Sequence, residues 1–326
     1  MKVSIVLGTR PEMIKLAPLL HEFQVREEHD FQLIHTGQHY SDSLDKTFFR
    51  ELDLPEPDHH LGVGSASHAE QTAQIMVQCE QIFIDYSPDL VFVQGDTNTV
   101  LAAALAVAKI KEIDLGHVEA GLRSFDRDMP EEMNRNLADV CSDLLFAPTE
   151  DAAANLRREN FDTDSIHTVG NTVVDAVYRH IELARNRTSV LEDLDVVPGE
   201  FALVTIHRAE NVDNEVVFER IISELESITL EGHTLLYPIH PRAEKRAREF
   251  DLYDRLDAAV TLVEPQDYLR FLRLEDEASV ILTDSGGLQE EAIILGTPCI
   301  TLRDSTERPE TVEEGGNVLV DPSSGN

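Results

Sequence analysis

Four ionisable residues stand just after short apolar runs or at the start of a helical segment, where their side chains could transfer protons. Asp96 follows "LVFVQG", Glu119 follows "IDLGHV" and His207 follows "FALVTI", while Glu131 stands in "MPEEMNR". Carboxylates and imidazole are the usual general acids and bases of enzymes. Each residue also has a structural reading, because Asp96 could be a helix N-cap, Glu131 a favourable charge at a helix start, and His207 a structural histidine.

A pair of glycines, Gly286 and Gly287, opens a helical segment after the apolar run "VILT". Glycine is a poor helix former, so its presence there needs a reason. Without a Cβ, a ligand can approach the backbone N–H groups, and a helix N-terminus favours negative charge. Arg10, Lys15 and Arg308 would add positive charge, although most such cations are simply solvated. The pattern favours a nucleotide diphosphate as the ligand.

Strand-like runs alternate with segments of helical period along the chain, which predicts parallel sheets with right-handed crossovers. The runs form two series: Val3–Gly8, Phe31–Thr36, Leu90–Gln94, Ile113–Val118, Leu144–Ala147 and Ile166–Val169, then Phe201–Ile206, Thr234–Ile239, Val260–Val263, Val280–Thr283 and Cys299–Leu302. We therefore expect an α/β protein with two doubly wound domains, residues 1–170 and 171–326, and a cleft between them. A (β/α)8 barrel is the alternative, against which the uneven spacing argues. Arg185–Glu200 is charged and is predicted to be a surface connection.

Ligands of open α/β sheets bind beyond the carboxyl ends of the strands. The candidate residues cluster after predicted strands, and this coincidence at several strand ends weakens the structural readings given above.

The composition limits the partners. With 62 acidic and 27 basic residues the formal net charge is −35, which repels nucleic acid and anionic membrane surfaces. An acidic surface spread along the whole chain suggests a protein of a concentrated-salt interior, where screening removes the self-repulsion. Three widely spaced cysteines indicate neither disulfides nor a zinc site. The first residues read as a strand rather than a secretory signal, so we expect a cytoplasmic protein.

The motifs predict no cofactor. Neither a GxxxxGK[ST] loop nor a GxGxxG after the first strand occurs, and Gly62-x-Gly64 reads as a loop. HExxH is absent, and His59 and His60 lie beside prolines in loop-like sequence, so no metal site is expected.

Ten short motifs together resemble one family. They are "GTRPEMIKLAPL", "TGQH", "QGDT", "GHVEAGLRS", "PEEMNR", "GNTVVDA", "TIHRAEN", "EPQDYLRF", "TDSGGLQEEA" and "TERPE". In this order, and across nearly the whole chain, they are similar to the non-hydrolysing UDP-N-acetylglucosamine 2-epimerases. Any one motif is weak, but the ordered set is highly specific.

The resemblance implies two Rossmann-like domains in the arrangement of GT-B glycosyltransferases, an active site in the interdomain cleft, and a homodimer. It implies interconversion of UDP-GlcNAc and UDP-ManNAc for polysaccharide biosynthesis. The family route is anti elimination of UDP to 2-acetamidoglucal followed by re-addition on the other face, which needs no redox cofactor.

Site residues follow by match of motif. The resemblance implies acid, base or sugar-orienting roles for Asp96, Glu119, Glu131 and His207, without deciding which removes the C2 proton. It implies contacts to the diphosphate, ribose and uracil from Arg10, Lys15, Gln266, Phe271, Ser285, Gly286, Gly287, Glu291 and Arg308.

Two departures accompany the resemblance. Some relatives are activated by UDP-GlcNAc at a second site, for which Gln38, His39, Arg208 and His240 are the candidates here; Glu70 stands near a position that is basic in some relatives, which argues against this regulation. Family members also continue beyond "NVLVD" with further helices, so the sequence ending at Asn326 is shorter than the resemblance implies.

Three enzymatic alternatives and one non-enzymatic alternative remain. They are an epimerase of a UDP-diacetamido-uronic acid, a hydrolysing epimerase that releases ManNAc, a GT-B glycosyltransferase, and a UDP-sugar-binding module. The glutamates at 119 and 131, with His207, argue against the last, because binding alone does not require them.

Overall fold

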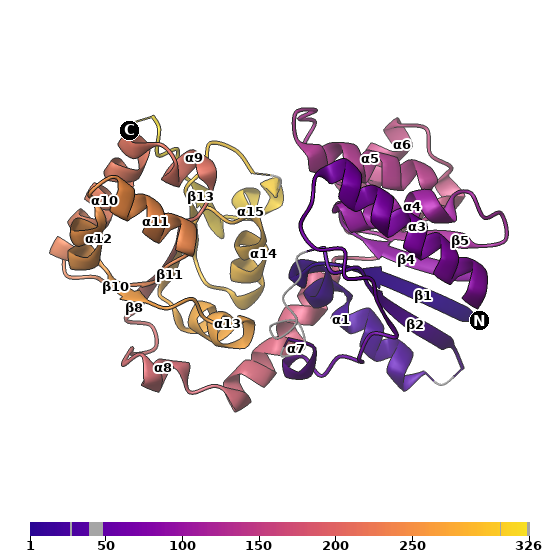
Figure 1. The fold of residues 1–326 in the computed structure, drawn as a ribbon. Coiled ribbons are helices and arrows are strands. Elements are labelled where there is room, and N and C mark those ends of the chain that lie inside the picture. Colours follow the sequence, from indigo (N-terminus) through magenta and orange to yellow (C-terminus); the bar gives the residue numbers. More distant parts are fainter. Residues whose placement is uncertain (27, 39–47, 307, 325–326) are drawn as a thin grey trace. The chain divides into compact units, whose positions relative to one another are not determined.

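The computed structural model describes residues 1–26, 28–38, 48–306 and 308–324. The chain divides into two compact units, Met1–Ala176 and Val177–Asn326 (Figure 1). The predicted domain boundary at residue 170 falls just before helix α7 (Thr172–Arg187), and the division between the units falls within that helix. Each unit contains one parallel sheet and its covering helices, so the fold is α/β with two Rossmann-like sheets.

Unit 1 has a seven-stranded sheet in the order β3-β2-β1-β4-β5-β6-β7, and all its pairings are parallel. The strands are β1 (Lys2–Leu7), β2 (Asp30–His35), β3 (His59–His60), β4 (Leu90–Gln94), β5 (Asp114–Val118), β6 (Leu144–Ala147) and β7 (Ile166–Thr168). The helices are α1 (Arg10–Val25), α3 (His68–Tyr86), α4 (Asn98–Val107), α5 (Pro130–Cys141), α6 (Glu150–Arg158) and the start of α7, with a 3₁₀ turn at Thr163–Ser165.

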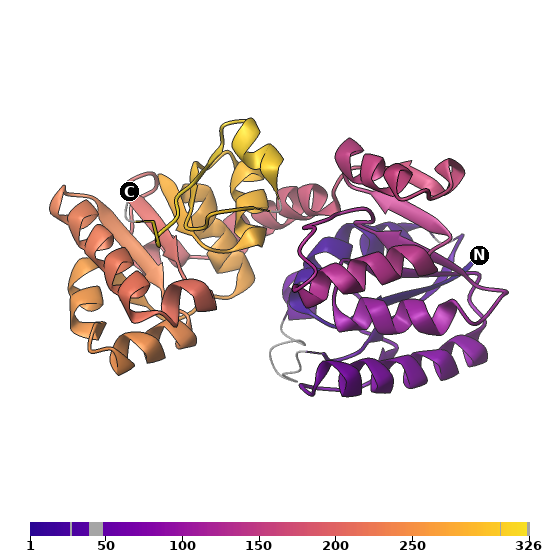
Figure 2. The same cartoon turned by 90° about the horizontal axis from the view of Figure 1, so that it is seen from above.

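The central strands of unit 1 are apolar along nearly their whole length because helices cover both faces. In β4 all five residues are buried, and in β1 all but Lys2 are. Helices α3, α4 and α5 lie side by side on one face (Figures 1 and 2), where Ile75, Cys79 and Phe83 of α3 join the core with strand residues. Helix α1 returns the chain from β1 to β2 in the opposite direction and so covers the other face.

Unit 2 has a six-stranded parallel sheet in the order β10-β9-β8-β11-β12-β13. Its strands are β8 (Phe201–Thr205), β9 (Thr234–Pro238), β10 (Thr261–Val263), β11 (Val280–Thr283), β12 (Cys299–Thr301) and β13 (Asn317–Leu319). Its helices are α8 (Val190–Asp193), α9 (Ala209–Val212), α10 (Glu215–Leu230), α11 (Pro241–Glu249), α12 (Tyr253–Ala259), α13 (Tyr268–Glu277), α14 (Gly286–Leu295) and α15 (Pro309–Glu313).

The strand order of each sheet reverses at one point, and ligands of doubly wound proteins bind beyond the strand ends at that point. In unit 1 the reversal lies between β1 and β4, and in unit 2 between β8 and β11. Asp96 follows β4, while His207 and Ser285 follow β8 and β11. Most of the candidate site residues are therefore at these two switch points or on the helices that start there.

The two open sheets confirm the predicted fold class and exclude the (β/α)8 barrel. Other expectations are corrected. His59 and His60 form edge strand β3 rather than a loop, and β13 was not predicted; both strands are too short for a periodic signal. The predicted surface connection at Arg185–Glu200 is wrong in its middle, because Val190 and Leu191 of α8 are buried in the core of unit 2. None of the helices among the described residues is long and apolar enough to cross a membrane.

Candidate active site

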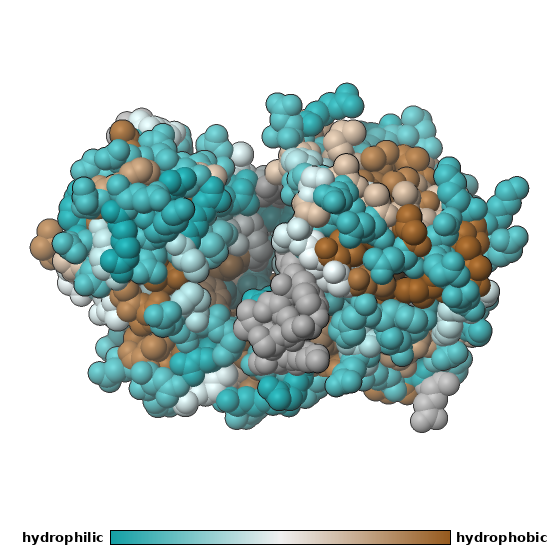
Figure 3. Space-filling model, viewed as in Figure 1, coloured by the Kyte–Doolittle hydropathy of each residue, from teal (hydrophilic) through white to brown (hydrophobic). Residues whose placement is uncertain are grey.

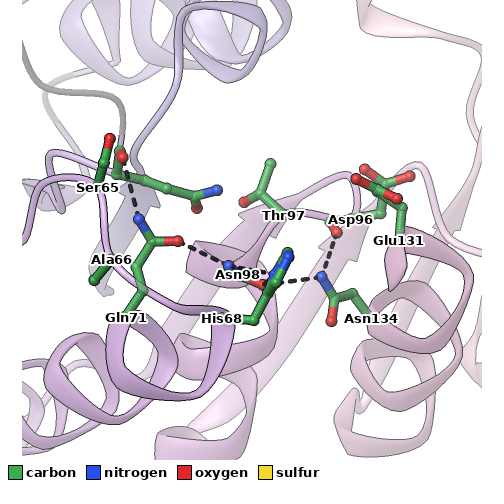
Figure 4. A pocket seen from close by; sticks show the side chains of 10 residues that line it. Ser65, Ala66, His68, Gln71, Asp96, Thr97, Asn98, Glu131 and Asn134 are labelled. Carbon is green, nitrogen blue, oxygen red and sulfur yellow. Dashed lines mark hydrogen bonds between the residues drawn. The ribbon is translucent and has the colours of Figure 1, made fainter. Parts of the chain in front are cut away.

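A cavity of about 320 Å³ opens beyond the carboxyl end of β4, one of the two strands at the switch point of unit 1 (Figure 4). The described residues that line it are Gln38, Ser65, Ala66, His68, Gln71, Asp96, Thr97, Asn98, Glu131 and Asn134. Two of the predicted acid–base residues, Asp96 and Glu131, therefore face the same cavity. Polar side chains hold its floor, since Asn98 Nδ2 donates to Gln71 Oε1 at 2.7 Å and Asn134 Nδ2 donates to the Asp96 carbonyl at 2.9 Å.

Asp96 is held by helix α5. Arg135 Nη2 donates to Asp96 Oδ2 at 2.5 Å, and Arg135 Nη1 also lies 3.3 Å from Glu132 Oε2. The N-cap of α4 is Thr97, whose side chain accepts from Val100 N, so Asp96 is not the cap that its structural reading required. Its carboxylate remains about one-third exposed. Asp96 thus combines a fixed position with an open side, as a proton-transferring group needs.

Glu131 and Glu132 are adjacent but differ in their surroundings. Glu132 is buried and accepts from Ser124 N, Ser124 Oγ and Phe125 N, so it ties down the loop before α5. Glu131 is exposed and lines the cavity. The Glu132 side chain is therefore engaged within unit 1, whereas the Glu131 side chain faces the cavity.

Glu119 lies apart from the described lining of this cavity, in a pair with Lys15. Lys15 Nζ donates to Glu119 Oε1 at 2.6 Å, and Gln94 Nε2 donates to Glu119 Oε2 at 2.5 Å. The Glu119 side chain is only 5% exposed. Its backbone has φ +67°, a left-handed conformation that costs energy outside glycine and asparagine and persists only where the surroundings enforce it. Lys15 was predicted to meet a diphosphate; here its ammonium meets Glu119.

Glu12 is a buried carboxyl that sequence reasoning missed. Its Oε2 accepts from Gly8 N at 2.6 Å and Thr9 N at 2.8 Å, and Thr97 Oγ1 donates to its Oε1 at 2.5 Å. It thereby joins the turn after β1 to the turn after β4. Burial raises its pKa from 4.5 to about 7, against the lowering effect of these hydrogen bonds.

In unit 2, His207 forms a pair with Asp284. Asp284 is fully buried and accepts from His207 N at 3.0 Å, Arg208 N at 2.9 Å and Asn211 Nδ2 at 3.1 Å. Burial opposes its charge, but bonds from His207, the Arg208 backbone and Asn211 outweigh burial and lower its pKa. His207 Nδ1 lies 3.1 Å from Asp284 Oδ1, so a proton on Nδ1 leaves Nε2 as the reactive nitrogen.

His240 packs beside this pair, with its ring 5.3 Å from the His207 ring. Its Nδ1 accepts from Arg242 N and so caps α11. Burial, followed by the charges of His207 and Arg242, lowers the pKa of His240. His207 and His240 are 33 positions apart in sequence, and only the adjacent strands β8 and β9 bring them together.

The predicted strand–turn–helix at residues 280–295 is confirmed. Strand β11 ends at Thr283, Ser285 is the N-cap of α14, and Gly286 and Gly287 form its first two positions. Ser285 makes no side-chain hydrogen bond to the helix end. At Gly287 a Cβ would meet no atom within 4 Å, and the backbone is not in the left-handed region. Neither packing nor backbone conformation therefore requires glycine at position 287. The missing side chain leaves open space beside the backbone amides.

The remaining predicted contacts in unit 2 are engaged within the unit. Arg308 Nε lies 2.9 Å from Glu290 Oε1. Gln266 donates to the Glu264 carbonyl and accepts from Arg270 Nε. Phe271 packs against a hydrophobic cluster of the unit 2 core, and Glu291 lies on α14, where its charge raises the pKa of half-buried Tyr268 after the larger effect of burial.

The candidate effector residues are not all accessible. Gln38 is buried, and its Oε1 accepts from both Thr99 N and Thr99 Oγ1 at 2.9 Å. Arg208 is the N-cap residue of α9. His39 lies outside the described residues.

The structure therefore joins Asp96 with Glu131, Lys15 with Glu119, and His207 with His240. Sequence reasoning missed Glu12, Gln94, Arg135, His117, Asp139 and Asp284. Asp284 directly follows β11, two residues before Gly286, so a search of the residues that follow strands could have found it. The others lie inside helices or strands, where polar residues carry no sequence signal of a site.

Comparisons with known proteins show one family to which the chain is similar. The family model described as UDP-N-acetylglucosamine 2-epimerase matches residues 21–326. The chain is 51% identical over 325 residues to a UDP-N-acetylglucosamine 2-epimerase from Methanocaldococcus jannaschii, covering 98% of this chain and 88% of that protein. It is 37% identical over 322 residues to a UDP-2,3-diacetamido-2,3-dideoxy-D-glucuronate 2-epimerase from Pseudomonas aeruginosa, covering 98% and 88%.

The fold matches as well. A crystal structure of the Methanocaldococcus jannaschii enzyme in complex with UDP-GlcNAc and UDP has a TM-score of 0.87 at 51% identity, covering 99% of this chain and 89% of that chain.

Proposed function

The chain belongs to the UDP-N-acetylglucosamine 2-epimerase family, and from this premise we propose that it interconverts UDP-GlcNAc and UDP-ManNAc without hydrolysis. The observation that carries the proposal is the 51% identity to an epimerase across 98% of the chain. The geometry supports it, because acid–base residues stand at the switch points of both sheets and open amides stand at the start of α14.

The chemistry explains why such residues are needed. The proton on C2 of the sugar is not next to a carbonyl, so its removal alone would leave a poorly stabilised carbanion. In the proposed route a base takes the C2 proton while the C1–O bond to UDP breaks, giving 2-acetamidoglucal and UDP. UDP then returns to C1 and a proton reaches C2 on the opposite face. No electron is gained or lost overall, so the step needs acids and bases and a site that retains UDP.

The paired residues suit these tasks. Asp96, held by Arg135 and partly exposed, and Glu131, exposed in the same cavity, suit proton transfer at the sugar. His207, whose Nδ1 faces Asp284, can exchange a proton at Nε2. The amides at Gly286 and Gly287, with the Ser285 hydroxyl, would hold the diphosphate at the N-terminus of α14, since the Ser285 N–H already donates to Thr283 Oγ1 at 2.9 Å. In this proposal unit 1 contributes carboxylates, and unit 2 contributes the histidine and the amides that bind the diphosphate.

A uronic-acid substrate is the second candidate, because a UDP-diacetamido-glucuronate epimerase is 37% identical to this chain. Such a sugar carries an extra carboxylate and calls for an extra cation. The described lining of the cavity contains two carboxylates, Asp96 and Glu131, and no lysine or arginine. This lining favours the uncharged sugar of UDP-GlcNAc.

One experiment separates the candidates. The protein is incubated with UDP-GlcNAc in deuterated water at high KCl, and C2 is followed by NMR. Deuterium at C2 together with UDP-ManNAc supports the proposal. Free ManNAc with UDP would mean a hydrolysing epimerase. If UDP-GlcNAc stays unchanged while UDP-diacetamido-glucuronate is converted, the second candidate is correct. Transfer of the sugar to an added acceptor would mean a glycosyltransferase.

We also propose a homodimer through unit 1. Apolar side chains gather on the face of unit 1 formed by α3, α4 and α5 (Figure 3), among them the exposed Val77, Ile84, Leu137 and Val140. Apolar patches on an otherwise strongly acidic surface are typical of protein contacts. Val140→Glu should shift the mass measured by analytical ultracentrifugation from two chains to one. Val216→Glu, at a similarly exposed valine on α10 of unit 2, should leave the mass unchanged. A wild-type protein that sediments as one chain would contradict the dimer.

The charge of −35 supports a further proposal, that the protein works in concentrated salt. Salt shortens the range of repulsion between carboxylates, so it should stabilise a folded state that concentrates them. The free energy of unfolding, measured in urea, is expected to rise from dilute buffer to molar KCl. Equal stability in both would count against a high-salt adaptation.

A further inference from the structure

A fully buried histidine and aspartate lie behind the site residues of unit 1. His117 is the fourth residue of β5, and Asp139 lies on α5; both are 0% exposed. His117 Nδ1 lies 2.7 Å from Asp139 Oδ1, and His117 Nε2 lies 2.8 Å from the carbonyl oxygen of Gly95. Neither residue touches the cavity, so the function proposed above gives them no role.

The contacts of this pair fall on both turns that carry site residues. Gly95 directly precedes Asp96, and its own N–H donates to the carbonyl of Val118 at 3.1 Å. On the other side, Asp139 Oδ2 accepts from Gly121 N at 3.2 Å. His117 and Gly121 stand two residues before and two after Glu119, whose backbone is left-handed. One hydrogen-bonded pair therefore fixes the turn of Asp96 and both flanks of the turn of Glu119.

The bonding pattern also decides the charge of the His117 ring. The Gly95 carbonyl can only accept a hydrogen bond, so Nε2 must carry a proton. Asp139 accepts at its other oxygen from Gly121 N and from Arg123 Nη2 at 2.8 Å, which holds it as a carboxylate, so Nδ1 must carry a proton too. An imidazole with protons on both nitrogens is a cation. Burial disfavours this cation, but the bond to Asp139, its charge, the Gly95 bond and the charge of Glu119 raise the pKa of His117.

The charges around the pair are balanced. Arg123 is buried against Asp139 and also reaches Glu159 at 2.6 Å, so two cations meet two carboxylates within this cluster. Beyond it, Glu119 has Lys15 as its direct partner. Because His117 and Asp139 themselves lie in β5 and α5, the cluster can hold a strained turn in place.

We propose that His117, as an imidazolium, and Asp139 are positioning residues that set the turns of Asp96 and Glu119 in one fixed relation for the reaction proposed above. The inference rests on the proposed function for its catalytic meaning. Its geometric part, two protonated ring nitrogens, is independent of turnover. A neutral histidine could satisfy only one of the two acceptors and would release either Gly95 or Asp139.

The first measurement needs no activity. Protein with ¹⁵N-labelled histidine rings is examined by NMR from weakly acidic to weakly alkaline pH, and the His117 signals are assigned by their loss in His117→Gln. Both ring nitrogens should keep the chemical shifts of protonated nitrogens throughout. One nitrogen with the shift of an unprotonated imidazole at neutral pH would overturn the proposal.

The second measurement is kinetic. Asp139→Asn keeps the shape but not the charge, and is expected to lower kcat for C2 epimerisation about 100-fold with KM changed less than about threefold. Asp143→Asn is the matched control, because Asp143, like Asp139, accepts from a backbone amide, in its case Leu115 N at 2.9 Å at the far end of β5. It should retain wild-type kcat. A folded Asp139→Asn variant with unchanged kcat would overturn the positioning role.

The two measurements separate the possible failures. If the wild-type protein neither exchanges the C2 proton nor epimerises but has a doubly protonated His117 ring, the proposed function is wrong and the His117 imidazolium is confirmed. If the wild-type protein is active but His117 is neutral, the proposed function is supported and the positioning by an imidazolium is wrong.

Discussion

The two units place their candidate residues at equivalent points of similar sheets, but they prepare them by opposite means. Unit 1 fixes charged side chains in pairs, Lys15 with Glu119 and Arg135 with Asp96. Unit 2 leaves bare backbone at the start of α14, with open space beside Gly287. Proton transfer requires ionisation states that neighbours hold in place. A diphosphate requires donors and room.

His207 in unit 2 shows that proton transfer, rather than the unit, calls for a paired ionisable side chain. His207 is the residue there that the proposal uses for protons, and it is locked to buried Asp284 in the manner of unit 1. Ser285 and Gly287, which are assigned to nucleotide binding, have no ionisable side chain and so need no charged partner to hold an ionisation state. The chemistry of each task, rather than its position in the fold, decides which kind of support surrounds a residue.

The largest effect is expected from breaking a unit 1 pair. Asp96→Asn removes a group proposed to transfer protons and should slow C2 exchange roughly 10³-fold, while the affinity for UDP, assigned to unit 2, stays within about threefold. Exchange is measured by NMR and UDP binding by calorimetry. Asp89→Asn is the control, since Asp89 accepts from Lys2 N before β4, at the other end of the same strand. If Asp96→Asn loses UDP affinity but keeps its turnover, the assignment of proton transfer to unit 1 and of UDP binding to unit 2 is wrong.

A smaller effect is expected from Glu12, the buried carboxyl that joins two turns of unit 1. Its folded-state pKa is raised from 4.5 to about 7, so its contribution to stability is fully present below pH 4.5 and is lost as pH rises through 7. The loss should reach roughly 3 kcal/mol.

Glu12→Gln keeps acceptor and donor without the charge and should remove this part of the pH dependence. Urea unfolding of both proteins at constant KCl, from weakly acidic to weakly alkaline pH, gives the difference. If the two profiles run parallel, Glu12 does not titrate in this range.

The smallest effect sharpens the description of unit 2. Gly287→Ala places a methyl group in open space within the first turn of a helix, so it should raise stability by about 1 kcal/mol and weaken UDP binding about tenfold. Gly296→Ala, at the other end of α14 where φ is +77°, should lower stability by about 1 kcal/mol and leave UDP binding unchanged. Thermal unfolding and calorimetry measure both quantities. Unchanged UDP affinity in Gly287→Ala would remove the anion site from these amides.

Much of the architecture follows from local sequence. Strands such as β4 and β11 have the residues that their apolar runs predicted, because buried parallel strands must be apolar on both faces. The short edge strands β3 and β13 and the buried α8 were missed, since segments of two to four residues are too short for a period. Asp96 and Gly287 were predicted to belong to the site because ligands of an α/β fold bind beyond the carboxyl ends of its strands, and Glu131 because it stands at the start of a helix.

The sequence by itself determined which residues end the strands, that the chain is acidic, and to which family it belongs. Only the tertiary structure decided what those residues meet: Lys15 meets Glu119 across 104 positions, and His117 meets Asp139 across 22. Strand ends are set by local hydrophobicity, which is read along the chain. Ionisation states are set by neighbours brought together from distant segments, and these exist only once the sheet has formed.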